Sequence, residues 1–352
     1  KMLHFVVLIA FWSFVFGVSI EKVSTNLLIN NVKSIPLKTP TLQDYQAIIE
    51  MQARYVLPWP SAHAGGHYRV LSNQQLQQLG QQFFSTASAP QNATAMALVI
   101  YDWTMPDFRR PNFYMTSWGN ITTLGQFITY LGQFGHPDVP RMFGLTNSDK
   151  QSVLQQLQQQ ITRVNRWCYG EASILHYALQ QLPAPDYIYH PVLYRGGGRD
   201  VPYFCDQFVK VWGLSIDECV ALYIQSGQSL TVRPFWSSTS HKYVINHFTG
   251  HVHWYFMPSP SRSGWQARRI RDFSVDYSQD EYLFPAGSQF DVVSSDCVVD
   301  PRDGRQLWNI TLREADVTLS AGPSRTTRLT INDHDTLPHR RRRSVTQCVS
   351  QP

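Results

Sequence analysis

The hydrophobic period of the chain changes at two prolines, Pro183 and Pro185, and this change limits the possible fold classes more than any other feature. Before the prolines, apolar residues recur at helical spacing over 154–182. After them, short apolar runs with strand character follow one another to about residue 319. Because helices come first and strands later, and the two do not alternate, the sequence predicts an α+β fold and not a parallel βαβ fold.

The same patterns predict the individual elements. Helices are expected over 41–57 and 72–83, and a longer helical region over 146–182 is expected to be interrupted at Gly170. The compact apolar run at 96–101 is typical of a buried strand. Further strands are expected at 187–189, 192–194, 231–235, 251–257, 270–274, 282–284, 290–293 and 307–312.

The two ends of the chain suggest a secreted protein. Residues 1–19 have the layout of a secretory signal peptide, and an uncleaved membrane anchor is the alternative. A polar leader, 20–40, precedes an N-terminal accessory region of unknown role at 41–145 and a helix-then-strand unit at 146–325. The basic tail, 326–352, contains four consecutive arginines, 340–343, which are either a solvated run or a processing site. The C-terminus is polar, so no lipid anchor is expected after signal cleavage.

Export would bring glycosylation and an oxidising environment. The acceptor sequences for glycans start at Asn92, Asn120 and Asn309. The chain has five cysteines, so two disulfides could form, with Cys348 as our candidate for the cysteine left over. No two cysteines have zinc-ligand spacing, so we expect no metal site. The net charge of +5 falls to +1 without the arginine run, so the sequence gives no case for a large nucleic-acid-binding face.

One carboxylate occupies a position suited to chemistry. Glu281 follows a polar turn that contains Tyr277 and Gln279, and it begins a short apolar run that ends at Pro285. A strand would fix the carboxylate while the loop offers polar groups to a ligand. The alternative is a solvated glutamate at a strand edge.

Two earlier motifs also lie at strand ends. Arg195 precedes three glycines, a pattern suited to a phosphate because guanidinium binds it bidentately and glycine lets backbone approach. Ser238 belongs to a hydroxyl cluster, 237–240, that could orient a carboxylate or a sugar hydroxyl. Arg195 and Ser238 are 43 positions apart, as are Ser238 and Glu281. Alone, each motif is equally explained by a surface turn or an ordinary strand end.

In this order, the three motifs resemble those of the mono-ADP-ribosyltransferases of the Arg–Ser–Glu type. The matching segments are Tyr194-Arg195-Gly196, the aromatic-to-serine run at 235–240, and Gln279-Asp280-Glu281. Flanking segments at 270–274, 283–285 and 290–292 match as well. The resemblance covers roughly 150–320 and leaves 20–145 unexplained. It implies a split, mainly antiparallel β-sandwich core, which makes 146–325 the expected catalytic domain.

The resemblance also implies roles for single residues. Arg195, with Gly196, would hold the pyrophosphate of the co-substrate NAD, and Ser238 would donate a hydrogen bond that orients Glu281. Glu281 would bind the 2′-hydroxyl of the nicotinamide ribose and stabilise the positive charge that develops as the nicotinamide bond breaks. No metal is implied. The remaining expected NAD-site residues, near the end of the serine strand, are Thr239 and Ser240.

The resemblance assigns the acceptor side to Gln279 and Tyr277. Arginine-modifying members carry glutamate where this chain has Gln279, whereas glutamine is similar to the asparagine-modifying Rho-directed exoenzymes and the DNA-modifying pierisin-like toxins. Asp280 is expected to point away from Gln279 and Glu281. A protein acceptor is therefore expected, with DNA as an alternative. An NAD glycohydrolase that uses water and a non-catalytic secreted binding domain are the other readings.

Overall fold

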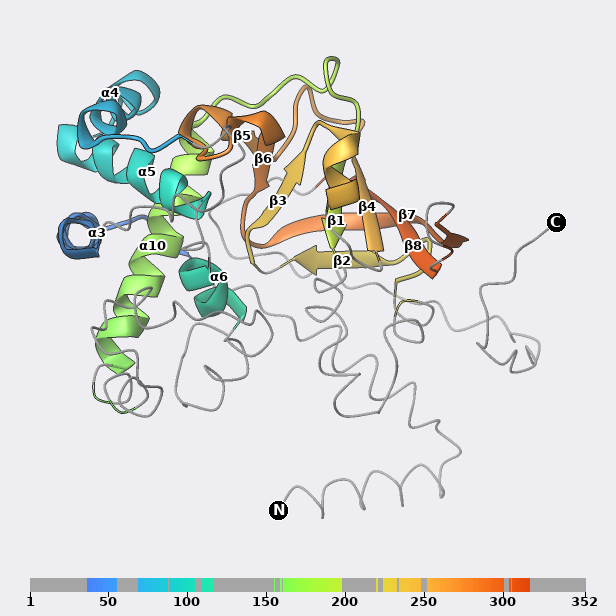
Figure 1. The fold of residues 1–352 in the computed structure, drawn as a ribbon, viewed down its shortest axis with the longest axis horizontal. Helices are drawn as coiled ribbons and strands as arrows, with labels where there is room; N and C mark the ends of the chain where they lie inside the picture. Colours follow the sequence, from blue (N-terminus) through green and yellow to red (C-terminus); the bar gives the residue numbers. More distant parts are fainter. Residues whose placement is uncertain are drawn as a thin grey trace, which may run out of the picture. The chain divides into compact units, whose positions relative to one another are not determined.

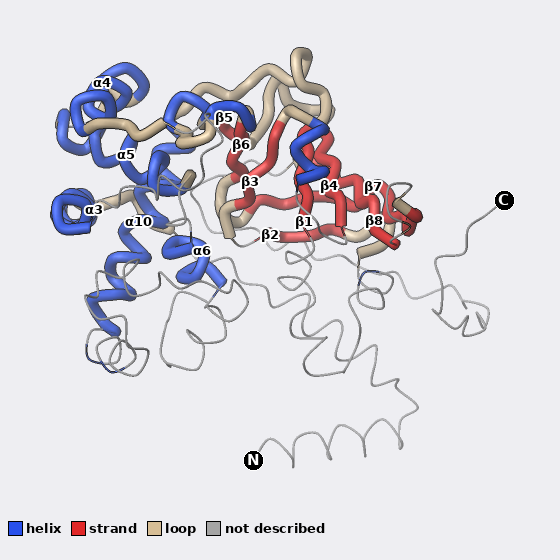
Figure 2. Tube along the Cα trace, viewed as in Figure 1, coloured by secondary structure: helices blue, strands red, loops and turns tan. Residues whose placement is uncertain are grey.

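The computed structural model describes residues 37–55, 69–87, 89–104, 109–116, 155, 159, 161–197, 220, 224–232, 234–247, 252–300, 304 and 306–316. The expected signal peptide, the basic tail with 340–343, Asn120 and Cys348 lie outside these residues. Within the described part of the chain, no helix is long and apolar enough to cross a membrane. The labelled α-helices lie on one side of the picture and the strands on the other (Figures 1 and 2).

Among the described residues, five α-helices precede the strands. Local capping explains where three of them begin. Thr41 and Asp44 exchange hydrogen bonds before the first helix, Ser72 and Gln75 form a capping box before the second, and Pro90 takes the first turn of the third. The helices are α3 (Leu42–Tyr55), α4 (Asn73–Phe83), α5 (Pro90–Trp103), α6 (Arg109–Thr116) and α10 (Ile161–Gln181).

The strand expected at 96–101 is wrong, because this run lies inside α5. All the residues of the run are buried, since α5 packs against α3, α4 and α10. A helix buried on all sides has no polar face, so its sequence shows the same unbroken apolar run as a core strand. The burial also affects the first glycan site: Asn92 is 6% exposed in α5, so the folded chain has no room for a glycan there.

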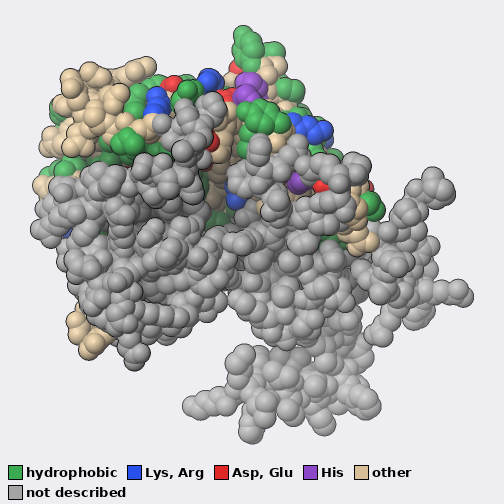
Figure 3. All heavy atoms as spheres, viewed as in Figure 1, with side chains coloured by type: hydrophobic (Ala, Val, Ile, Leu, Met, Phe, Trp, Pro, Cys, Tyr) green, Lys and Arg blue, Asp and Glu red, His purple; other side chains and the backbone are tan. Residues whose placement is uncertain are grey.

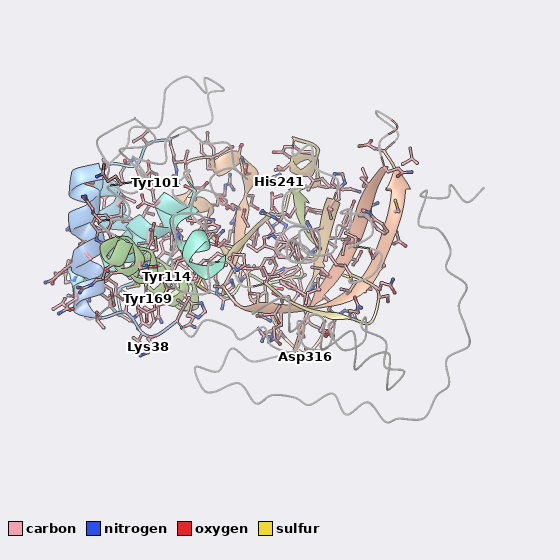
Figure 4. The ribbon with its side chains drawn as sticks, turned by 90° about the horizontal axis from the view of Figure 1, so that it is seen from below. Lys38, Tyr101, Tyr114, Tyr169, His241 and Asp316 are labelled. Carbon is pink, nitrogen blue, oxygen red and sulfur yellow. The ribbon has the colours of Figure 1, made fainter. Side chains whose placement is uncertain are left out.

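Helix α10 is continuous through Gly170, so the interruption expected at this glycine is wrong. A Cβ on Gly170 would lie 3.5 Å from Asp44 Oδ1, which is an ordinary contact. Cys168 lies buried in the same helix, whereas Cys348, our candidate for the cysteine left over, lies outside the described residues. Tyr114 of α6 packs edge-on against Tyr169 of α10, with ring centroids 5.6 Å apart, and the two rings lie close together in Figure 4.

In the part of the chain that the structure describes, eight strands form one hydrogen-bonded sheet in the order β2-β7-β8-β4-β1-β3-β6-β5. Only β4 and β8 are parallel, among the strands that the structure describes. The α+β class and the mainly antiparallel sheet are therefore confirmed. The strands are β1 (Leu193–Gly197), β2 (Ser229–Val232), β3 (Trp236–Thr239), β4 (Val252–Met257), β5 (Arg268–Arg269), β6 (Glu281–Phe284), β7 (Ser288–Val299) and β8 (Gln306–Glu314).

The sheet curls so that its distant strands share one aromatic core. Phe290 of β7 and Phe284 of β6 are five places apart in the sheet order, yet their ring centroids lie 5.1 Å apart. The ring centroid of Trp236, on β3, lies 5.1 Å from that of Phe256 and 5.9 Å from that of Phe290. These rings bury large apolar areas at edge-to-face geometry, which fixes β3 and β6 relative to each other where Trp236 pairs with Phe284. The candidate site lies at the other end of this strand pair, where Thr239 pairs with Glu281.

Two expected strands are absent from the described residues. The segment 187–189 is a turn in which Ile188 and Tyr189 are exposed, so the strand starts later, at Leu193. The segment 270–274 contains a short 3-10 helix, η3 (Arg271–Phe273). The buried side chain of Phe273 packs on Phe83 and Phe84 at the end of α4. This segment therefore packs against a helix instead of pairing with a strand.

The close approach of α4 to α5 depends on Gly80. A Cβ at this position would lie 2.7 Å from the backbone carbonyl carbon of Ala93, inside contact distance. We therefore expect Gly80→Ala to lower the free energy of unfolding by about 1–3 kcal/mol through overpacking. Gly170→Ala is the matched control, because it has room and should gain up to about 1 kcal/mol from helix propensity. Urea unfolding of both variants measures the difference, and equal effects would contradict the tight contact.

Candidate active site

The candidate site lies where a helical turn meets the first residue of a strand. The turn is η4 (Tyr277–Gln279), and β6 begins at Glu281. Between them Asp280 has a φ of 45°, a left-handed conformation rare outside glycine. Glu281 pairs with Thr239 of β3, and its carbonyl oxygen accepts a hydrogen bond from the backbone of Ile270 at 2.9 Å. The junction is thus held from both sides, as expected for a carboxylate placed between a loop and a strand.

Asp280 points away from the site, as expected. Its side chain is buried and binds Arg269 Nε at 2.6 Å and the hydroxyl of Ser240. Burial alone would raise the pKa of Asp280, but these two donors hold it below the usual value. Ser240 is expected among the NAD-site residues. In the structure its hydroxyl donates a hydrogen bond to Asp280 and holds that side chain in place.

Glu281 receives donors from two distant elements. Trp103 Nε1, at the end of α5, donates to Glu281 Oε1 at 3.2 Å, and the side chain of Ser237 also hydrogen-bonds to the carboxylate. Burial raises the pKa of Glu281 above its usual value. The two hydrogen bonds and the charge of Arg195 oppose that rise, while the charge of Asp276 adds to it. The result is a desolvated carboxylate with oriented donors.

The side chain of Ser237, the neighbour of Ser238, adds a hydrogen bond that lowers the pKa of Glu281, and the role expected for Ser238 stays a prediction. The hydroxyl of Ser238 donates to the carbonyl oxygen of Tyr282 at 3.1 Å. Successive side chains of a strand point to opposite faces. Since Thr239 is the direct partner of Glu281, Ser237 shares the face of Thr239, and Ser238 points to the aromatic core with Trp236.

The remaining expected site residues lie nearby. Arg195 Nη1 donates to the carbonyl oxygen of Ser237 at 2.7 Å, and the guanidinium carbon lies 5.8 Å from the ring centroid of Trp236. Gly196 follows it on β1, opposite His253 of β4. The hydroxyl of Thr239 donates to the carbonyl oxygen of Gln279, which ties β3 to the turn. Arg195, Thr239 and Glu281 therefore meet at one end of the sheet.

The acceptor side of the turn is more open. Tyr277 is 41% exposed, and its carbonyl oxygen accepts from Arg271 Nε at 3.0 Å. The exposed Tyr243, after β3, donates its hydroxyl to the carbonyl oxygen of Ser278 at 3.3 Å. Charged side chains of both signs and histidine gather along this edge of the molecule (Figure 3), and His241 is labelled there in Figure 4.

The N-terminal helical region holds the loop before the turn. Arg69 donates side-chain hydrogen bonds to the carbonyl oxygens of Ser274, Arg271 and Asp272, and its backbone N–H donates to Val275. Thr104 accepts a hydrogen bond from the backbone of Val275 at 3.0 Å. The region 41–145, whose role the sequence left open, thus fixes the loop and supplies Trp103 to the carboxylate.

Four contributors to the site were missed from sequence. Strand alternation, applied from Glu281 to its neighbour β3, could have found Ser237. No local signal marks Arg69, Trp103 or Thr104, because each acts on residues more than 170 positions away. Their side chains are typical of any helix end or connecting segment.

Comparisons with known proteins find likeness among solved structures. No family model and no curated protein sequence matches this chain. The ADP-ribosyltransferase HopU1 of Pseudomonas syringae has 15% identity and a TM-score of 0.44, over 79% of this chain and 100% of its own. The type III effector XopAI of Xanthomonas axonopodis has 14% identity and a TM-score of 0.43, over 79% and 84%. The Clostridium limosum C3 exoenzyme has 13% identity and a TM-score of 0.37, over 72% and 99%. Because these TM-scores are below 0.5, we base the function on the site itself.

The surroundings of Glu281 predict its titration. We expect a carbon-13 NMR titration to place the pKa of the Glu281 carboxyl above the usual glutamate range. Trp103→Phe should raise it further, because the variant removes a donor that favours the charged form while keeping an aromatic ring against Phe235. Trp308→Phe, on β8, is the matched control and should leave the pKa of Glu281 unchanged. A fall in the pKa of Trp103→Phe would contradict the hydrogen bond.

Proposed function

We propose that this chain is an NAD-dependent mono-ADP-ribosyltransferase, which cleaves the nicotinamide–ribose bond and transfers ADP-ribose to a macromolecular acceptor. One observation supports it above the others: a desolvated carboxylate, Glu281, is oriented by Trp103 and Ser237 within the field of Arg195. A carboxylate held in this way is suited to a sugar carbon that becomes positively charged.

Glu281 has two roles in this proposal. It accepts a hydrogen bond from the 2′-hydroxyl of the nicotinamide ribose, and its charge stabilises the ribose as the bond to nicotinamide breaks. Because the donors are already in place, little reorganisation is needed when the charge develops. The leaving group is cationic in NAD, so its departure needs no added proton.

Arg195 and Gly196 form the anion side of the site. The guanidinium is fixed by the carbonyl oxygen of Ser237 and by the ring of Trp236, which orients its planar fork. Gly196 lets a pyrophosphate approach the backbone of β1. Thr239 supports this arrangement through Gln279, and Ser238 and Ser240 act as structural supports through Tyr282 and Asp280.

The acceptor is expected at the exposed turn, against Tyr277 and Gln279. We propose a protein acceptor, met outside the producing cell if 1–19 act as a signal peptide. Water is the competing acceptor, because Gln279 cannot serve as a base for an incoming nucleophile.

Labelled NAD tests the proposal. The protein is incubated with NAD carrying a label in the adenylate part, together with cell lysate or, separately, with DNA. We expect release of nicotinamide and a labelled macromolecule, and Glu281→Gln should lower both by a factor of about 10²–10³. Nicotinamide release without any labelled product would identify a glycohydrolase. Full activity in Glu281→Gln would overturn the assignment.

The two neighbouring serines give a sharper comparison. Ser237→Ala removes a donor to Glu281 and should slow nicotinamide release by roughly tenfold, with the acidic limb of the pH profile moved to higher pH. Ser238→Ala removes a hydrogen bond to the backbone of Tyr282 and should lower thermal stability more than activity. The reverse order of effects on release would show that Ser238, and not Ser237, orients the carboxylate.

A further inference from the structure

Gln279 is held by a carboxylate that the motif does not contain. Its amide nitrogen Nε2 donates to Asp276 Oδ2 at 2.8 Å. The other oxygen of Asp276 is occupied, because Oδ1 accepts from the backbone of Ser278 at 3.1 Å and from its hydroxyl at 2.5 Å. Asp276 thus caps the turn and faces Gln279 with its second oxygen.

This contact decides which way the amide of Gln279 faces. A carboxylate accepts hydrogen bonds and cannot donate them, so only the NH₂ end of the amide can lie against it. The amide oxygen Oε1 must then point away from Asp276, and among the described residues it makes no hydrogen bond. The backbone of Gln279 is held as well, because its N–H donates to the carbonyl oxygen of Asp276 and Thr239 donates to its carbonyl oxygen, so the side chain starts from a fixed position.

On the premise of the transferase activity proposed above, we propose that Asp276 is a positioning residue that sets acceptor specificity. By fixing Gln279 with its oxygen outward, it selects an acceptor nitrogen that carries N–H, such as a guanidinium, a primary amide or an exocyclic amine. A carboxylate acceptor, which has no hydrogen to donate at neutral pH, is rejected.

The electrostatics act in the same direction. The charge of Asp276 reaches Glu281, whose pKa it raises after the larger effect of burial. Although the motif has one carboxylate fewer than in arginine-modifying enzymes, the site keeps two negative groups. They repel an anionic acceptor and favour a neutral or cationic one.

The transfer step needs no reactant besides NAD and the acceptor. The bond from the ribose carbon to nicotinamide breaks, and its electron pair leaves with nicotinamide. The lone pair of the acceptor nitrogen forms the new bond to the same carbon, and one N–H proton passes to water. Gln279 holds an N–H hydrogen during this step and takes no proton.

Asp276→Asn reverses the arrangement. The turn needs an acceptor at the oxygen that binds Ser278, so the new NH₂ group takes the place of Oδ2 and faces Gln279. Two NH₂ groups cannot pair, so the amide of Gln279 turns over and presents its own NH₂ group outward. We expect the ratio of acceptor labelling to NAD hydrolysis to fall about tenfold, mainly through a higher KM for the acceptor.

The double variant Asp276→Asn/Gln279→Glu distinguishes a changed orientation of the side chain at 279 from a folding defect. Its new carboxylate would accept from Asn at 276 and again present an oxygen outward, so the labelling ratio should recover. Asp272→Asn is the charge-matched control: this exposed carboxylate in η3 makes no side-chain hydrogen bond with the described residues. It should retain the native ratio. Agmatine, an asparagine-containing peptide and a guanine-containing oligonucleotide serve as probes beside cell lysate.

Each outcome decides one question. Mass spectrometry that locates ADP-ribose on nitrogen in the native reaction, with loss in Asp276→Asn and recovery in the double variant, supports the inference. Modification at a carboxylate, an unchanged ratio in Asp276→Asn, or no rescue would overturn it, as would hydrolysis with no product on any probe or lysate component. If native protein releases no nicotinamide at all, the proposed function itself fails.

Discussion

The carboxylate of Glu281 is the group on which the rest of the structure depends. A carboxylate removed from water is costly unless hydrogen bonds compensate for the lost solvation. Its donors come from α5 through Trp103 and from β3 through Ser237, with Arg195 of β1 adding charge. The helices and the sheet must therefore be assembled together before the carboxylate is stabilised, which makes the N-terminal helical region a part of the site.

A single backbone reversal then separates two adjacent carboxylates. The left-handed conformation of Asp280 costs on the order of 1 kcal/mol for a residue other than glycine. The bonds of its side chain to Arg269 and Ser240 offset that cost. The carboxylate of Asp280 is therefore bound within the fold, while the carboxylate of Glu281 faces its hydrogen-bond donors. Arg69 donates hydrogen bonds to three carbonyl oxygens of the loop before Asp280, and these bonds hold that loop in place.

Sequence patterns could predict what depends on local spacing. The change of period at Pro183 was enough for the fold class, and the polar turn before an apolar run was enough to place Glu281 at a loop–strand junction. The run at 96–101 was misread, because a fully buried helix and a core strand have the same composition over six residues. The contact of Trp103 with Glu281 was beyond reach, since it depends on how α5 packs against the sheet. Which serine shares the face of Thr239, the partner of Glu281, depends on strand register, which short motifs do not fix.

A carboxylate at 276 is not equivalent to one at 279. Asp276 accepts two hydrogen bonds from Ser278 and one from Gln279, so three of its roughly four acceptor positions are used and these bonds weaken it as a base. It acts mainly through its charge and through the orientation it imposes. Bond formation must then rely on the nucleophilicity of the acceptor and on the positive charge of the ribose, which Glu281 stabilises.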